Sequence, residues 1–157
     1  MTAYMDHKDL ANEVIDQSRA QEITDGVHRV LDRIAAAEST AGREAGSVQL
    51  LAATKTRDVG EIMAAIGAGI HLIGENRPQE VTVKAPGLAR LLSERGMSLG
   101  VIGAAGASNG AAASGAANGV GDSDSTGASA NAANHIPFHL IGQLQANKIG
   151  KVLPAGD

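Results

Sequence analysis

Two hydrophobic periods alternate along the chain, one typical of helices and the other of buried strands. From residue 23, apolar side chains recur every three or four residues, which predicts an amphipathic helix through Val27, Val30, Leu31 and Ile34. Residues 48–57 contain an apolar run that stops at Lys55, which stands between two threonines. A run of this kind predicts a strand buried on both faces of a parallel sheet.

Helices and strands continue to alternate after Lys55. Asp58 and Glu61 have the spacing of a capping box, so we expect a helix to begin there and to bury Val59, Ile62, Met63 and Ile66. Residues 70–73 predict a second strand. Pro78 suits the first position of the next helix, which we expect Pro86-Gly87 to interrupt.

The last ordered part of the predicted fold is a third strand over residues 136–141, followed by a short helix over 145–152. Between residues 96 and 134 the sequence is dominated by Gly, Ala, Ser and Asn, and we expect a flexible insertion there. Strands that alternate with helices over short connections predict an α/β fold with a parallel sheet.

Composition and charge argue against several kinds of binding partner. The net charge is −4, which argues against a nucleic-acid-binding protein. The chain has no cysteine, no histidines at metal-ligand spacing and no apolar stretch long enough to cross a membrane. The glycine-rich tract lacks the phosphate-loop pattern. We therefore expect a cytoplasmic monomer that binds neither metal, nucleic acid nor membrane.

The candidate chemistry lies where the predicted strands end. Lys55 follows the first strand, Glu75 and Asn76 the second, and Gly142-Gln143 the third. Because the carboxyl ends of parallel strands share one edge, these residues can converge on a small-molecule site. A partly desolvated lysine in such a site can act as an amine nucleophile that forms Schiff bases, although a lysine at a strand end can also simply extend to water.

The other candidates also have structural alternatives. Glu75 could be a carboxylate stabilised by a helix amino terminus, and Asn76 could be a helix N-cap. His139 lies in an apolar strand, where a hydrogen-bonded core histidine is the common alternative to a functional one.

Three segments in order resemble the pyridoxal phosphate homeostasis protein family. They are Leu-Leu-Ala-Ala-Thr-Lys-Thr at residues 50–56, Gly-Glu-Asn-Arg-Pro-Gln-Glu at 74–80, and Phe-His-Leu-Ile-Gly-Gln-Leu-Gln-Ala-Asn-Lys at 138–148. The resemblance implies a fold-type III barrel, related to the amino-terminal barrel of alanine racemase. This chain would contribute the first three βα units of a (β/α)₈ barrel, preceded by an amino-terminal helix.

The resemblance also implies a ligand and roles for individual residues. Lys55 matches the lysine that forms a Schiff base with pyridoxal 5'-phosphate, Asn76 and His139 match positions at the barrel mouth, and Lys148 closes the third segment. Proteins of this family hold and buffer the cofactor in vitamin B6 homeostasis without an assigned reaction. A racemase-like enzyme is the alternative, but it needs a tyrosine base, and Tyr4 is the only tyrosine.

The sequence also departs from the family pattern. Thr54 replaces the usual Ser, Phe138 replaces the usual Trp, and the family's late phosphate-binding segments do not follow the third segment. We therefore expect a truncated portion of a longer chain, and a fragment that binds no cofactor is a further alternative. The predicted divisions are a polar tail (1–22), the first part of the barrel (23–95), the insertion (96–134) and the third strand with its helix (135–157).

Overall fold

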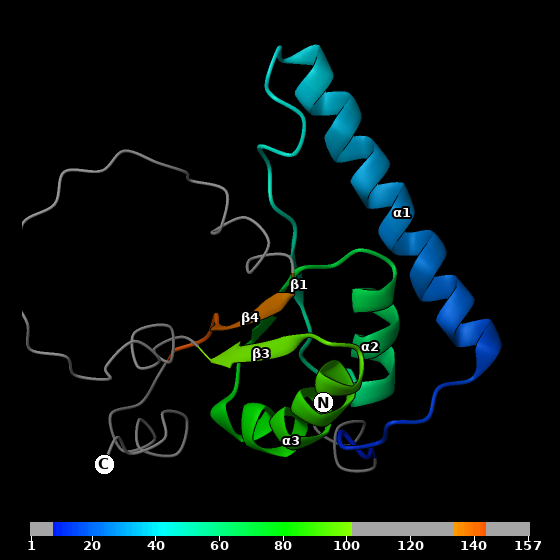
Figure 1. Cartoon of the computed structure of the whole chain (residues 1–157), viewed down its shortest axis with the longest axis vertical. Helices are drawn as coiled ribbons and strands as arrows, with labels where there is room; N and C mark the ends of the chain where they lie inside the picture. The colour runs from blue at the N-terminus through cyan, green and yellow to red at the C-terminus, as the bar shows by residue number, and fades with distance from the viewer. Residues whose placement is uncertain (1–7, 102–133, 144–157) are drawn as a thin grey trace, which may run out of the picture.

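A computed structural model describes residues 8–101 and 134–143, which form three helices and one four-stranded sheet (Figure 1). All neighbouring strands are parallel, in the order β1-β2-β4-β3, so the predicted α/β fold with a parallel sheet is confirmed. The predicted helix over 145–152, with Lys148, lies outside the described residues. The elements are α1 Gln17–Thr40, β1 Leu51–Ala53, α2 Val59–Gly67, β2 Leu72–Glu75, α3 Pro78–Glu94, β3 Ser98–Val101 and β4 His135–Leu140.

The strand order corrects two sequence-based expectations. Residues 98–101 lie in the predicted flexible insertion but form the edge strand β3. The backbone of β4 supplies their hydrogen-bonding partners, and local composition does not reveal such distant partners. The predicted third strand is consequently the fourth. Since β4 lies between β2 and β3, the described strands do not follow one another in the consecutive order of a barrel.

The first helix begins earlier than its hydrophobic period suggested. Asp16 is the N-cap, and its carboxylate accepts hydrogen bonds from the backbone N–H groups of Ser18 and Arg19. The expected start near residue 23 is therefore wrong, because the cap and the packing on α2 stabilise the first turns, in which apolar residues are few. The segment before the helix is also packed, since the carbonyl of Leu10 accepts a hydrogen bond from the first residue of α2.

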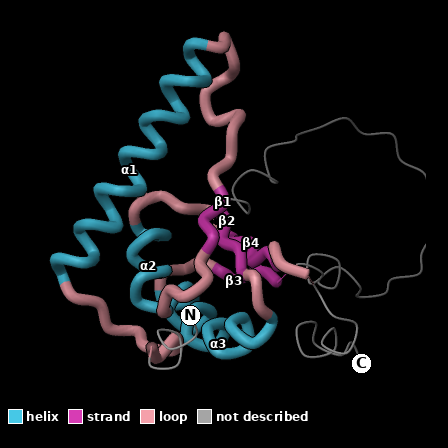
Figure 2. The backbone as a smooth tube through the Cα atoms, turned by 180° about the vertical axis from the view of Figure 1, so that it is seen from behind, coloured by secondary structure: helices cyan, strands magenta, loops and turns pink. Residues whose placement is uncertain are grey.

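The strand before Lys55 is shorter and less buried than predicted. β1 spans only Leu51–Ala53. Ala53 is exposed, and Val48 is 42% exposed. Figures 1 and 2 show α2 and α3 on one face of the sheet, with α1 packed outside α2. Among the described residues no second layer of helices covers the other face, so burial on both faces does not occur.

The second and third helices combine confirmed and corrected expectations. Asp58 and Glu61 form the predicted capping box, and the expected apolar face of α2 is buried. Pro78 begins α3 as predicted, but the helix continues through Pro86 instead of stopping there. A proline within a helix costs about 3 kcal/mol. Complete burial of Leu88 and Leu92 beyond it offsets that cost.

The hydrophobic core lies between the sheet and the two helices that cover it. Ile73 of β2 and Phe138 of β4 are paired in register and point into this core, which places their sequence neighbours on the opposite face. The buried apolar side chains are Val59, Ile62, Met63, Ile66, Ile70, Ile73, Val81, Leu88, Leu92, Ile136 and Phe138.

Glu61 connects the amino-terminal segment and α1 to the start of α2. Its carboxylate oxygens lie 2.5 Å from Lys8 Nζ, 3.1 Å from Arg19 Nε and 3.3 Å from Arg57 Nη1. Burial alone would raise the pKa of Glu61, but the hydrogen bonds donated by Lys8 and Arg19 outweigh it and hold the pKa at about 2.

Acid should therefore weaken the fold through Glu61. A carboxyl whose pKa is lowered on folding stabilises the protein above its unfolded pKa, and that stabilisation is lost as the pH falls from about 4.5 to about 2. We expect Glu61→Gln to lower the free energy of unfolding at pH 7 by about 2 kcal/mol and to flatten its fall in this pH window. Urea unfolding at several pH values measures this. Glu94→Gln on the surface is the control, and an acid dependence unchanged in Glu61→Gln would contradict the prediction.

Candidate functional site at the carboxyl edge of the sheet

The structure brings the three predicted strand ends together. Beyond β1, the N–H of Thr54 donates to the carbonyl of Gly74 at 2.8 Å, and beyond β4, the N–H of Ile141 donates to the carbonyl of Glu75 at 2.8 Å. A Cβ added to Gly142 would lie 2.1 Å from the carbonyl oxygen of Asn76, so these backbones are in close contact. The segments carrying Lys55, Asn76 and Gly142 therefore follow neighbouring strands at one edge.

Lys55 lies in a tight turn immediately after β1. The N–H of Arg57 donates to the carbonyl of Thr54 at 3.0 Å and closes the turn. Thr56 has φ = 65°, a left-handed conformation that β-branched residues rarely adopt. The Lys55 side chain is exposed. The turn thus presents the lysine to solvent at the sheet edge while its backbone is constrained.

Asn76 follows the end of β2 and His139 lies in β4, and within residues 8–101 and 134–143 neither is hydrogen-bonded to Lys55. Asn76 is exposed, and the N-cap of α3 is Arg77, so the alternative that Asn76 caps that helix is wrong. His139 is paired in register with Gly74 and so lies on the face opposite the helices. Its Nε2 atom is buried and has no hydrogen-bonding partner within residues 8–101 and 134–143.

A buried polar cluster, formed by Thr54, Glu75, Glu80 and Lys84, lies directly beneath the turn. Lys84 Nζ is fully buried and donates to Glu75 Oε1 at 2.6 Å, to Glu80 Oε2 at 2.9 Å and to the carbonyl of Thr54 at 2.9 Å. Thr54 Oγ1 donates to Glu75 Oε1 at 2.7 Å. Glu75 is therefore a core carboxylate, and the alternative of a helix-start carboxylate is wrong.

The two carboxylates of this cluster have opposite pKa shifts. Burial raises the pKa of Glu75, in spite of the hydrogen bonds from Lys84 and Thr54. Burial also acts to raise the pKa of Glu80, but hydrogen bonds from Lys84 and from the backbone of Thr56 outweigh it and lower that pKa. One ammonium thus faces one carboxylate that ionises readily and one that resists ionisation.

Sequence reasoning missed the cluster although a signal was present. Glu80 and Lys84 have the i, i+4 spacing of a favourable ion pair within a helix, which does not by itself indicate burial. Lys84, however, lies three residues after Val81 and four before Leu88, on the apolar stripe that α3 buries. A lysine within a helix's apolar stripe indicates a buried partner, because an unpaired buried ammonium is costly.

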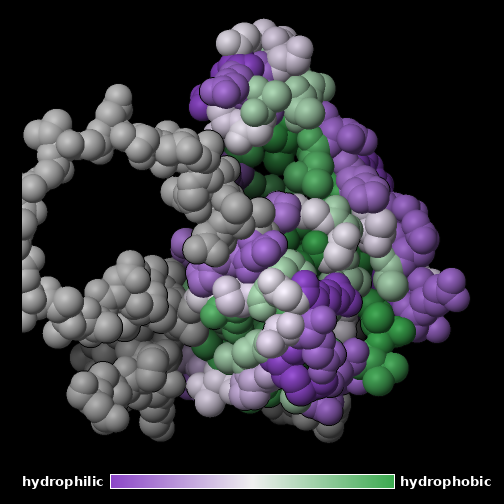
Figure 3. All heavy atoms as spheres, in the orientation of Figure 1, coloured by the Kyte–Doolittle hydropathy of each residue, from purple (hydrophilic) through white to green (hydrophobic). Residues whose placement is uncertain are grey.

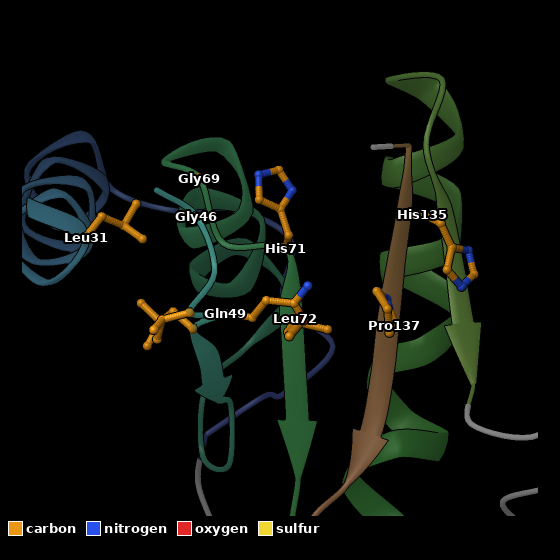
Figure 4. A pocket seen from close by; sticks show the side chains of 10 residues that line it. Leu31, Gly46, Gln49, Gly69, His71, Leu72, His135 and Pro137 are labelled. Carbon is orange, nitrogen blue, oxygen red and sulfur yellow. The ribbon is translucent and has the colours of Figure 1, made fainter. Parts of the chain in front are cut away.

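A cavity of about 580 Å³ lies at the other edge of the sheet (Figure 4). It is lined by residues that precede or begin the strands, including His71 and His135, and by Leu31 of α1. Figure 3 shows hydrophobic side chains gathered in a hollow beside α1. Because Lys55 follows the carboxyl end of β1, this cavity is separate from the candidate site.

Several general classes of site are not found in the described part of the chain. Residues 8–101 and 134–143 contain no cluster of three or more side chains that could hold a metal ion. None of the helices in these ranges is both long and apolar enough to cross a lipid bilayer. The fold and the site thus define a parallel α/β protein that presents a lysine and an asparagine at the carboxyl edge of its sheet.

Comparison with known proteins finds relatives in the family that the three sequence segments resemble. Pyridoxal phosphate homeostasis proteins of Mycobacterium tuberculosis and Mycobacterium bovis are 36% identical to this chain over 85 residues, which cover 53% of this chain and 33% of the relative. The protein of the same name from Mycobacterium leprae is 26% identical over 131 residues, covering 83% and 38%. The predicted resemblance to this family is confirmed, and the chain spans about a third of the length of these relatives.

A solved structure is more similar still. A protein of Bifidobacterium adolescentis, described only as unknown, is 65% identical, with a TM-score of 0.72 over 94% of this chain and 47% of its own. No family model matches the chain.

Proposed function

We propose that this chain binds pyridoxal 5'-phosphate through Lys55 and takes part in the homeostasis of this cofactor. We propose further that it acts as a monomer in the cytoplasm. The single observation that carries the proposal is the constrained turn that presents the Lys55 amine at the carboxyl edge of a parallel sheet, where Asn76 follows the neighbouring strand. Ligand sites of parallel α/β proteins are found at this edge. The names of the mycobacterial relatives favour this cofactor over other aldehydes.

The donor set suits the cofactor. An exposed primary amine can react with an aldehyde, and the Asn76 amide can both donate and accept a hydrogen bond. The buried His139 Nε2 atom lacks a partner within the described residues, so it is free to bind a polar ligand group. When bound, the cofactor would supply an aldehyde that is otherwise reactive toward any amine.

The proposed bond forms by condensation. When the cofactor is bound, the Lys55 amine would supply the nucleophile that condenses with the aldehyde, and its two protons and the carbonyl oxygen would leave as water. No oxidant or reductant is required, and water reverses the step, which suits a protein that stores and releases a reactive aldehyde.

We further propose, from the family resemblance, that β1, β2 and β4 belong to a (β/α)₈ barrel, and that β3, which pairs with β4 out of consecutive order, is an addition to the barrel pattern. The alternative function, a racemase-like enzyme, has one specific requirement. It needs a second acid–base group opposite the lysine, and the described residues contain no tyrosine, since Tyr4 precedes them. A chain that binds no cofactor is the remaining alternative.

A titration with pyridoxal phosphate separates these functions. We expect a visible absorbance band of the protein-bound Schiff base, and none with pyridoxine phosphate, which carries an alcohol in place of the aldehyde. Addition of L-alanine to the loaded chain should yield no D-alanine, whereas racemisation would favour the enzyme. Absence of the band with pyridoxal phosphate would reject the proposed function.

A further inference from the structure

The buried cluster beneath the turn contacts the backbone on both sides of Lys55. On one side, Lys84 Nζ donates to the carbonyl of Thr54 at 2.9 Å. On the other, the N–H of Thr56 donates to Glu80 Oε2 at 2.9 Å. Lys84 and Glu80 are themselves joined at 2.9 Å, so one ion pair of α3 holds both flanks of the lysine.

We infer that Glu80 and Lys84 are positioning residues that fix the direction in which the turn presents the Lys55 amine. This inference rests on the proposed function, and it adds two residues that act through the backbone of the turn. A solvent-exposed lysine has many side-chain rotamers. Fixing its backbone keeps the Cα atom of Lys55 in one position, so that only the side-chain rotamers vary.

The conformation of Thr56 gives an independent reason for such a clamp. A β-branched residue with φ = 65° has a strained backbone conformation. Such strain persists only where surrounding contacts hold it. The hydrogen bond from the Thr56 N–H to the buried Glu80 carboxylate is such a contact, since hydrogen bonds to charged groups are stronger than those between neutral groups.

Glu75 completes the clamp from the sheet. It is fully buried at the end of β2 and accepts hydrogen bonds from Lys84 and from Thr54 Oγ1. The Lys84 ammonium is therefore held by the sheet and by α3 at once. The turn, the second strand and the third helix are therefore joined through one ammonium beneath Lys55.

Glu80→Ala tests the inference, because it removes the acceptor of the Thr56 N–H and leaves Lys84 paired with Glu75. In the full chain without cofactor, we expect amide hydrogen exchange at Thr56 to quicken about tenfold, the factor for losing one such hydrogen bond. With pyridoxal phosphate, the rate of Schiff-base formation should fall about tenfold. Glu80→Gln, which keeps an acceptor oxygen, should recover part of both effects.

Two controls distinguish positioning from a general loss of stability. Leu92→Ala weakens the core of the same helix and Glu94→Ala removes an exposed glutamate from it, so neither should change the rate of Schiff-base formation by folded protein. If Glu80→Ala leaves Thr56 exchange and the reaction rate unchanged, or changes them no more than Leu92→Ala does, the inference is overturned. If the wild-type chain forms no Schiff base, the proposed function fails, while Thr56 exchange still decides whether Glu80 holds the turn.

Discussion

Lys55→Ala is expected to abolish the absorbance band that pyridoxal phosphate produces with the wild-type chain. The alanine has no amine to condense with the aldehyde, and the exposed lysine can be removed with little effect on stability. The melting temperature should therefore stay within a few degrees of the wild-type value. Absorbance titration and thermal unfolding of both proteins measure these two quantities.

Other lysines provide the control for this prediction, because pyridoxal phosphate can condense with any accessible amine. Lys151→Ala removes the same charge and the same functional group from another part of the sequence. It should leave the band and its concentration dependence unchanged. An equal reduction of the band in Lys55→Ala and Lys151→Ala would mean that the reaction is not specific to Lys55.

Lys84→Met should lower the free energy of unfolding by about 3–5 kcal/mol, the cost of removing one partner from a buried ion pair. The methionine fills most of the space of the lysine stem but leaves Glu75 and Glu80 without their shared ammonium. Because folded proteins are only marginally stable, a loss of this size can unfold the chain. Urea unfolding followed by circular dichroism measures it.

A second substitution separates the lost charge from lost packing. In the double variant Lys84→Met/Glu75→Gln, one unpaired carboxylate becomes a neutral amide, and we expect part of the stability to return. If the loss in Lys84→Met came from packing alone, the second change would recover nothing. A loss below about 1 kcal/mol in the single variant would show that the cluster contributes no more than a surface ion pair.

Local signals predicted the features that depend on neighbouring residues in the sequence. The capping box of Asp58 and Glu61, the apolar face of α2 and the start of α3 at Pro78 are as expected, because each is determined within one or two helical turns. The parallel sheet and its common carboxyl edge followed from the alternation of helices and strands.

Features that depend on distant partners could not be predicted in this way. Strand β3 exists because β4 pairs with it across residues 102–133, a contact that the composition of residues 96–134 conceals. The burial of Lys84 depends on Glu75 from another element. The roles proposed for Lys55, Asn76 and His139 come from strand ends and from the family resemblance, and they remain predictions.

Reduction with borohydride followed by peptide mapping tests the central claim most directly. The reagent converts a Schiff base into a stable secondary amine, so the modified lysine can be located by tandem mass spectrometry. At one equivalent of pyridoxal phosphate, the label should be found on Lys55 and be lost when pyridoxine phosphate replaces the aldehyde. A label spread evenly over Lys8, Lys55, Lys148 and Lys151, or no label at all, would contradict the claim that Lys55 is the cofactor-binding lysine.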